Sequence, residues 1–163
     1  MVTGPHFPCK RVALSTPCEN PRELALSWID NRDSDNWALI SGTALASEIH
    51  GWVAHSVLLR NRDREIMKSN SLDGEFIRLI SGTHHVATSF KRAGLGVGDK
   101  TAWIVDLSGQ NSDELFEKHA NRMGFEILQD RPNLDIFDHQ RLGIEGESSE
   151  NAAIGHIHLA DLR

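Results

Sequence analysis

Histidines are the residues of this 163-residue chain that are best suited to bind a metal ion, and there are nine of them. His84 and His85 are adjacent, and adjacent residues on a helix point about 100° apart, so they could not easily share one ion. His156 and His158 have the spacing of two ligands on a strand, but no third ligand follows in a definite register, and the chain has no CxxC or HExxH motif. A metal-dependent hydrolase that uses His156 and His158 is the alternative function.

No nucleophile or nucleotide loop stands out. Ser41-Gly42 and Ser81-Gly82 lack the glycine two positions before the serine that a nucleophile elbow requires. The glycine cluster at residues 94–98 follows an expected helix and precedes an expected strand, which is the reverse of the order in a dinucleotide-binding loop. We therefore expect no catalytic residues, no metal and no cofactor, and a protein that is not an enzyme.

Positive charge is concentrated in one part of an acidic chain. The formal net charge is −6, yet residues 60–92 hold seven basic and four acidic residues. Such polarity can orient a partner. The alternative is an ordinary solvated face on which the arginines pair with Asp63 and Glu65.

The start of an expected helix lies inside this basic segment. Thr83 is a suitable N-cap for a helix over residues 84–93, and a helix N-terminus beside cations binds anions such as RNA phosphate. Arg60, Arg64 and Lys68 would line one face if the preceding helix continued that far. The candidate RNA-binding residues are Arg60, Arg62, Arg64, Lys68, His84, His85, Lys91 and Arg92.

Hydrophobic spacing and helix caps predict a mixture of short strands and helices. Strands are expected at residues 11–15, 37–40, 101–107 and 125–128. Helices are expected from Pro21 to about residue 31, at 44–59, around 72–80, at 84–93, from about 112 to Gly124, at 134–142 and at 150–162. Thr43 would cap the helix at 44–59. In the helix at 84–93, Val86, Ala87 and Phe90 would face inward.

These elements predict a single α+β domain with a small, largely antiparallel sheet of three to four strands packed with several helices. Residues 1–20 are expected to form an irregular leader, because four of the five prolines fall within the first 22 residues, and residues 21–163 to form the domain. Cys9 and Cys18 are interpreted as free thiols. With no apolar run long enough to span a bilayer, we expect a cytoplasmic protein that does not bind membranes.

Residues 72–95 resemble the central signature of a known family. The run Leu-Asp-Gly-Glu-Phe-Ile-Arg-Leu-Ile-Ser-Gly-Thr-His-His-Val-Ala-Thr-Ser-Phe-Lys-Arg-Ala-Gly-Leu is similar to that of the small kinase-associated subunit of the KEOPS (EKC) complex, the TPRKB-like family. The likeness covers residues 39–128 and the C-terminal tail, which resembles that of archaeal members. The signature positions that we single out are Glu75, Ile80, Ser81, Gly82, Val86 and Gly94.

The resemblance implies a non-catalytic adaptor. In KEOPS, the family member binds the small atypical kinase-like ATPase of the complex and helps to hold tRNA while another subunit makes threonylcarbamoyl-adenosine (t6A). The residues named above would then face tRNA. The tail would contribute an apolar patch that faces the kinase, formed by Ile157, Leu159 and Leu162.

Overall fold

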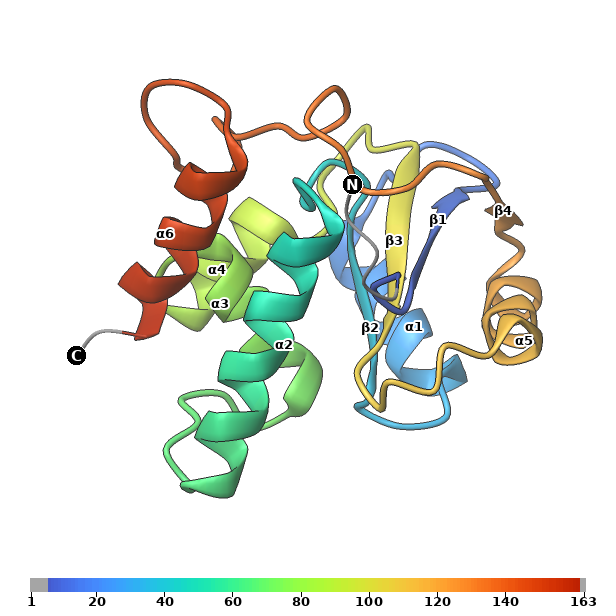
Figure 1. The fold of residues 1–163 in the computed structure, drawn as a ribbon. Helices are drawn as coiled ribbons and strands as arrows, with labels where there is room; N and C mark the ends of the chain where they lie inside the picture. The colour runs from blue at the N-terminus through green and yellow to red at the C-terminus, as the bar shows by residue number, and fades with distance from the viewer. Residues whose placement is uncertain (1–5, 162–163) are drawn as a thin grey trace.

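A four-stranded antiparallel sheet lies at the centre of the molecule (Figure 1). The structure is a computed structural model that describes residues 6–161. The strands are β1 (Cys9–Ala13), β2 (Trp37–Ser41), β3 (Thr101–Asp106) and β4 (Glu126–Ile127), in the order β2-β3-β1-β4. On β3, Val105 lies opposite Cys9 of β1 and Ala38 of β2. The expected α+β fold with a small antiparallel sheet is confirmed.

The chain follows a β-α-β-β-α-β path with one large insertion. Helix α1 (Pro21–Asn31) connects β1 to β2, and α5 (Asp113–Met123) connects β3 to β4, as in the ferredoxin-like arrangement. Three helices are inserted between β2 and β3: α2 (Glu48–Asp63), α3 (Leu72–Ser81) and α4 (Val86–Ala93). Helix α6 (Glu150–Asp161) follows β4 and packs on α2 and α3.

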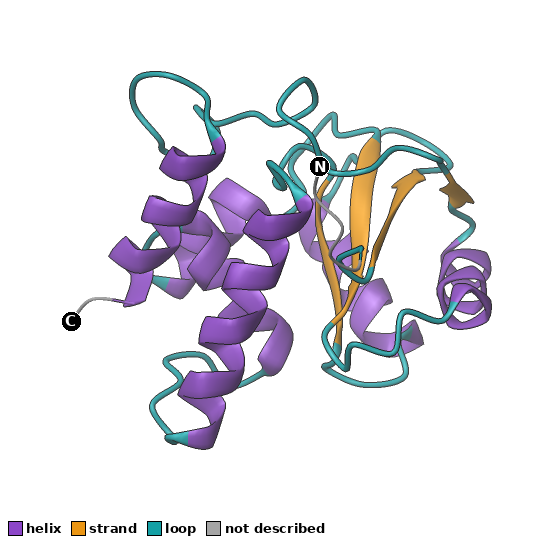
Figure 2. Cartoon of the chain, viewed as in Figure 1, coloured by secondary structure: helices purple, strands orange, loops and turns teal. Residues whose placement is uncertain are grey.

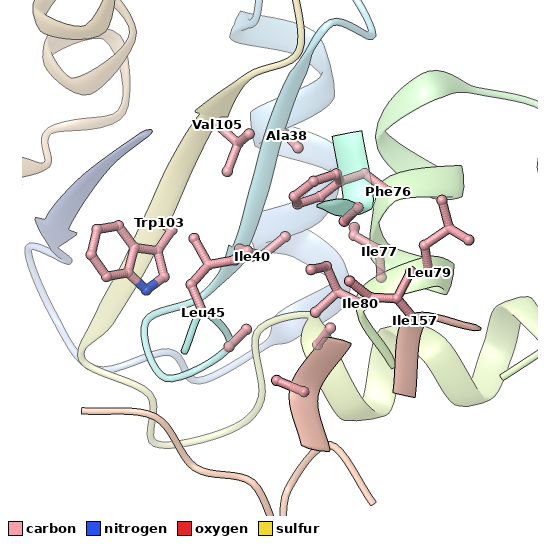
Figure 3. Close-up of a cluster of buried hydrophobic side chains, with 14 of the residues drawn as sticks. Ala38, Ile40, Leu45, Phe76, Ile77, Leu79, Ile80, Trp103, Val105 and Ile157 are labelled. Carbon is pink, nitrogen blue, oxygen red and sulfur yellow. The ribbon is translucent and has the colours of Figure 1, made fainter. Parts of the chain in front are cut away.

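Helices cover both faces of the sheet (Figure 2). Trp103 and Val105 of β3 share one core with residues of α2, α3 and α6, whereas Ala102 and Ile104 share the other with residues of α1 and α5. Because successive side chains point to opposite faces, a strand covered on both sides is apolar throughout. This burial explains why the sequence predicts β3 so clearly. Figure 3 shows the first of these cores.

Two helices in the insertion begin later than the sequence predicts. The expected helix at residues 44–59 is in fact α2, which begins after Ser47, because the Ser47 hydroxyl accepts a hydrogen bond from the His50 N–H at 3.0 Å. The expected helix at residues 84–93 begins at Val86. The Thr83 hydroxyl accepts from the His85 N–H at 3.2 Å, so it stabilises the turn before the helix.

The inward face expected for α4 is also wrong. Ser89 and Ala93 are buried, whereas Val86, Ala87 and Phe90 are exposed. A face of small residues lets α4 lie close to its neighbours, and its larger apolar side chains are left at the surface. In α1, Trp28 is buried and Ile29 is half-exposed.

Residues 6–20 include an ordered strand, in contrast to the irregular leader expected for residues 1–20. β1 lies between β3 and β4, and Phe7 is completely buried beside Trp52 and Phe76. Burial raises the pKa of the Cys9 thiol to about 12, so this cysteine is an unreactive core residue.

The expected helix at residues 134–142 is a series of turns.

Candidate nucleic-acid interface

The eight predicted RNA-facing residues differ in how free their charges are. Three arginines contact other groups of the protein: Arg60 pairs with Asp161, Arg62 Nε lies 3.3 Å from Asp63 Oδ1, and Arg92 Nη1 donates to the Ser81 carbonyl at 2.9 Å. The Arg62 pair is exposed and is worth little, so Arg62 stays available to a ligand. Arg60 is largely neutralised, and Arg92 holds α4 to the end of α3.

Arg64 and Lys68 are exposed, and neither has an ion-pair partner among residues 6–161. They would share one helix face with Arg60 only if α2 continued through residue 68, and it does not. Helix α2 ends at Asp63, and Glu65 then adopts a left-handed φ of 58°, so that the Ile66 N–H bonds back to the Asn61 carbonyl at 2.9 Å. Both cations therefore lie on the turn and loop between α2 and α3.

The start of α4 is the second candidate anion-binding feature. His84 and His85 are exposed immediately before the helix, and Lys91 is exposed in its last turn. No side chain caps the first turn, and no acidic residue lies in it. Since the first N–H groups of a helix lack intrahelical acceptors and carry partial positive charge, this exposed turn presents donors to an anion.

A buried ion pair in α3 lies between these two features. Glu75 and Arg78 have side chains that are 0% and 1% exposed, and Arg78 Nη2 lies 2.7 Å from Glu75 Oε2. Burial raises the pKa of the Glu75 carboxyl, but the hydrogen bonds and charge of Arg78 outweigh this effect and hold the pKa below its usual value. Glu75 is thus a charged core residue.

Helix α3 separates the two candidate anion-binding features along the chain. Lys68 lies just before its N-terminus, whereas His84 and His85 lie just after its C-terminus. Four of the eight predicted residues therefore form two separate groups: Arg64 with Lys68 before α3, and His84 with His85 after it.

The predicted kinase-facing residues of the tail do not form one surface. Ile157 is completely buried and packs in the core near Ile80, so its assignment to an interface is wrong (Figure 3). Leu159 is exposed on α6. Leu162 lies outside the described residues.

An apolar groove that the sequence does not predict lies between α1 and α4. It encloses about 360 Å³, and its walls include Ala25 and Ile29 from α1 and Phe90 from α4. The Arg32–Asp73 ion pair also lines it. The sequence pattern does not predict the groove because it assigns Phe90 to the inward face of its helix.

The histidines of the alternative function do not converge. His156 and His158 lie on α6, where residues two apart point about 200° from each other. His156 is buried with Nε2 2.7 Å from the Leu142 carbonyl oxygen, and His158 is exposed. Between His6 and Asp161, no three potential metal-binding side chains are close enough to hold an ion. Over the same part of the chain, no helix has the length and apolarity needed to cross a bilayer.

The signature positions have distinct structural roles. Glu75 and Ile80 are buried in α3, the Ser81 hydroxyl donates to the Arg78 carbonyl at 2.8 Å, and Gly82 ends α3 in the left-handed conformation. Gly94 ends α4, and Val86 begins it at the surface.

No family model matches the chain, and it has no significant match among curated proteins.

Proposed function

We propose that this protein is the non-catalytic, kinase-associated subunit of a KEOPS complex, which binds the small atypical kinase of that complex and helps to hold tRNA for t6A modification. The proposal rests on the resemblance of residues 72–95 to the TPRKB-like signature. The observation that supports it best is the exposed start of α4, where His84 and His85 precede a helical turn that has no side-chain cap.

The cationic groups suit the backbone of a single RNA strand. Free N–H groups at a helix start bind one phosphate well, and Lys68 with Arg64 would bind another. An acidic body with local positive charge favours binding in one orientation, because the remaining surface repels the same polyanion. These features require no base-specific contact.

Kinase binding is assigned to exposed apolar surface. Leu159 is 54% exposed on α6, and it is the one residue of the predicted tail patch that the structure shows at the surface. A single exposed leucine is common in monomeric proteins, so Leu159 alone would form only part of a protein interface. A charged substitution there should weaken binding of the kinase while leaving the fold intact.

Binding of tRNA measured against salt concentration tests the RNA half of the proposal. The double variant His84→Ala/His85→Ala and the double variant Arg64→Ala/Lys68→Ala should each weaken binding, and the second should reduce the salt slope by about one to two units. Lys118→Ala, a charge removal on the exposed face of α5, is the control. If both double variants bind tRNA like the control, the RNA assignment is wrong.

Co-purification tests the protein half. The chain is expressed with the KEOPS kinase subunit, and Leu159→Glu is compared with wild type and with Leu134→Glu, an exposed leucine outside α6. Loss of the kinase from Leu159→Glu alone supports the assignment. Failure of the wild-type chain to bind the kinase rejects the proposed partner.

A further inference from the structure

The ion pair between Glu75 and Arg78 contacts the backbone on both sides of α3. Glu75 Oε1 accepts hydrogen bonds from the N–H groups of Lys68 and Ser69, both at 3.1 Å. Its other oxygen accepts from Asn61 Nδ2 at 3.2 Å. The carboxylate therefore fixes the loop that carries Lys68 and joins it to the last turns of α2.

Arg78 makes the corresponding contacts at the other end of α3. Its Nη1 donates to the Ala160 carbonyl at 2.6 Å and lies 3.4 Å from the Thr83 carbonyl. Thr83 in turn accepts from the His85 N–H through its hydroxyl. The guanidinium thus links the segment before α4 to the C-terminal turn of α6 and, through Glu75, to the Lys68 loop.

From these contacts we infer that Glu75 and Arg78 are positioning residues that hold the Lys68 loop and the His84–His85 segment in a fixed relative arrangement for binding an RNA backbone. The inference rests on the proposed function and deepens it. Neither residue touches the ligand, because both side chains are buried. They act through the backbone of residues 68–69 and residue 83.

Energetics distinguish this role from simple stabilisation. Removing two charges from water costs several kcal/mol per ion, so a buried ion pair is often no more stabilising than well-packed apolar side chains of similar volume. An apolar pair would fill the same space in α3. It would leave the N–H groups of Lys68 and Ser69 and the Thr83 carbonyl without these partners, so the flanking segments would move more freely.

The test is the double variant Glu75→Met/Arg78→Met, with Leu79→Met as the control for repacking of the same buried helix. Neither the double variant nor the control removes a charge from the surface. We expect the double variant to fold, and its tRNA affinity to fall roughly tenfold with a salt slope lower by about one to two units, because the phosphate contacts are no longer held together. A folded double variant with wild-type affinity and slope overturns the inference.

A second variant covers the case in which the double variant does not fold. Arg78→Lys keeps a cation next to Glu75, but one ammonium group lacks the planar fork that bridges Glu75 and the two carbonyls. Amide exchange at His85 should then be faster, and tRNA should bind more weakly. Unchanged exchange and affinity in Arg78→Lys overturn the inference.

The same measurements separate this inference from the proposed function. If His84→Ala/His85→Ala and Arg64→Ala/Lys68→Ala leave tRNA binding intact, the RNA site itself is wrong. If those variants weaken binding but the ion-pair variants do not, the RNA site stands and only the positioning role is rejected.

Discussion

The imidazole of His156 lies directly against Gly82, so close that a β-carbon on residue 82 would come within 2.3 Å of the ring. Gly82 also has φ 70°, a left-handed conformation that side chains other than glycine rarely adopt. The glycine that ends α3 therefore serves two purposes: it reverses the chain, and it makes room for α6.

Replacement of Gly82 by alanine should consequently destabilise the protein by about 2–4 kcal/mol, the sum of a conformational cost near 1 kcal/mol and the displacement of a buried ring. Denaturant unfolding measures the change. Gly124→Ala is the matched control, since Gly124 ends α5 with φ 73° but has no atom within 4 Å of a built β-carbon. Equal losses for the two variants would show that the contact with His156 contributes nothing.

Buried histidines should make the fold sensitive to acid. Burial lowers the pKa of His50 to about 3, with a further lowering by the charge of His156, and its Nδ1 accepts from the Ala46 N–H at 3.0 Å. Below about pH 6.5 the unfolded chain binds a proton that the folded chain excludes. Stability from this group is fully present above that pH and is lost as the pH falls toward 3.

The free energy of unfolding should fall by about 1.4 kcal/mol per pH unit on account of His50 in that window. The pKa of His156 is also lowered by burial, so it adds to the slope. His50→Asn keeps an acceptor near the Ala46 N–H but does not titrate, and its unfolding free energy should depend less on pH. If the unfolding free energy had the same slope against pH in wild type and variant, His50 would be excluded as the source of the pH dependence.

The sequence predicts the sheet and the helices well where burial is two-sided or a cap is unambiguous. β3 is apolar throughout because both its faces are covered, and Gly124 ends α5 as expected. The true start of α2 is missed because Thr43 and Ser47 are both possible caps, and only the tertiary structure selects Ser47. Local residue patterns cannot distinguish two equally suitable caps.

The candidate site is less predictable for a physical reason. Charge and spacing identify basic residues, but they do not show that Arg60 pairs with Asp161, 101 residues away in the chain. Nor do they show that α4 packs through Ser89 and Ala93 rather than through Phe90. In a short amphipathic helix two faces can be plausible, and the neighbouring helices decide between them.

Arg131 should be among the arginines on which the fold depends most. It donates to Glu48 Oε1 at 2.7 Å, to the Cys9 carbonyl at 2.6 Å and to the Phe7 carbonyl at 2.8 Å. It thereby ties the segment after β4 to β1 and α2. Arg131→Ala should cost about 2–4 kcal/mol, since hydrogen bonds to a charged group are worth more than neutral ones and several are lost together.

Arg122→Ala is the control for Arg131, because Arg122 forms an exposed pair with Asp33 at 2.7 Å and should cost less than about 1 kcal/mol. Thermal and denaturant unfolding of both variants give the comparison. A similar small loss for the two would mean that the three contacts of Arg131 do not stabilise the fold.

The pairing of Arg60 with Asp161 leads to a prediction that separates two arginines of the same basic segment. Arg60→Ala removes a charge that Asp161 already neutralises, and the Arg60 hydrogen bond and charge help to hold the pKa of that carboxyl below its usual value. Arg64 has no ion-pair partner among the described residues. The slope of tRNA affinity against salt concentration should therefore fall by about one unit in Arg64→Ala and by almost nothing in Arg60→Ala.

The variant Asp161→Asn frees the Arg60 charge without removing it, so it should leave this slope unchanged or raise it. If Arg60→Ala lowers the slope as much as Arg64→Ala, then the ion pair opens when RNA binds, and Arg60 contacts phosphate directly.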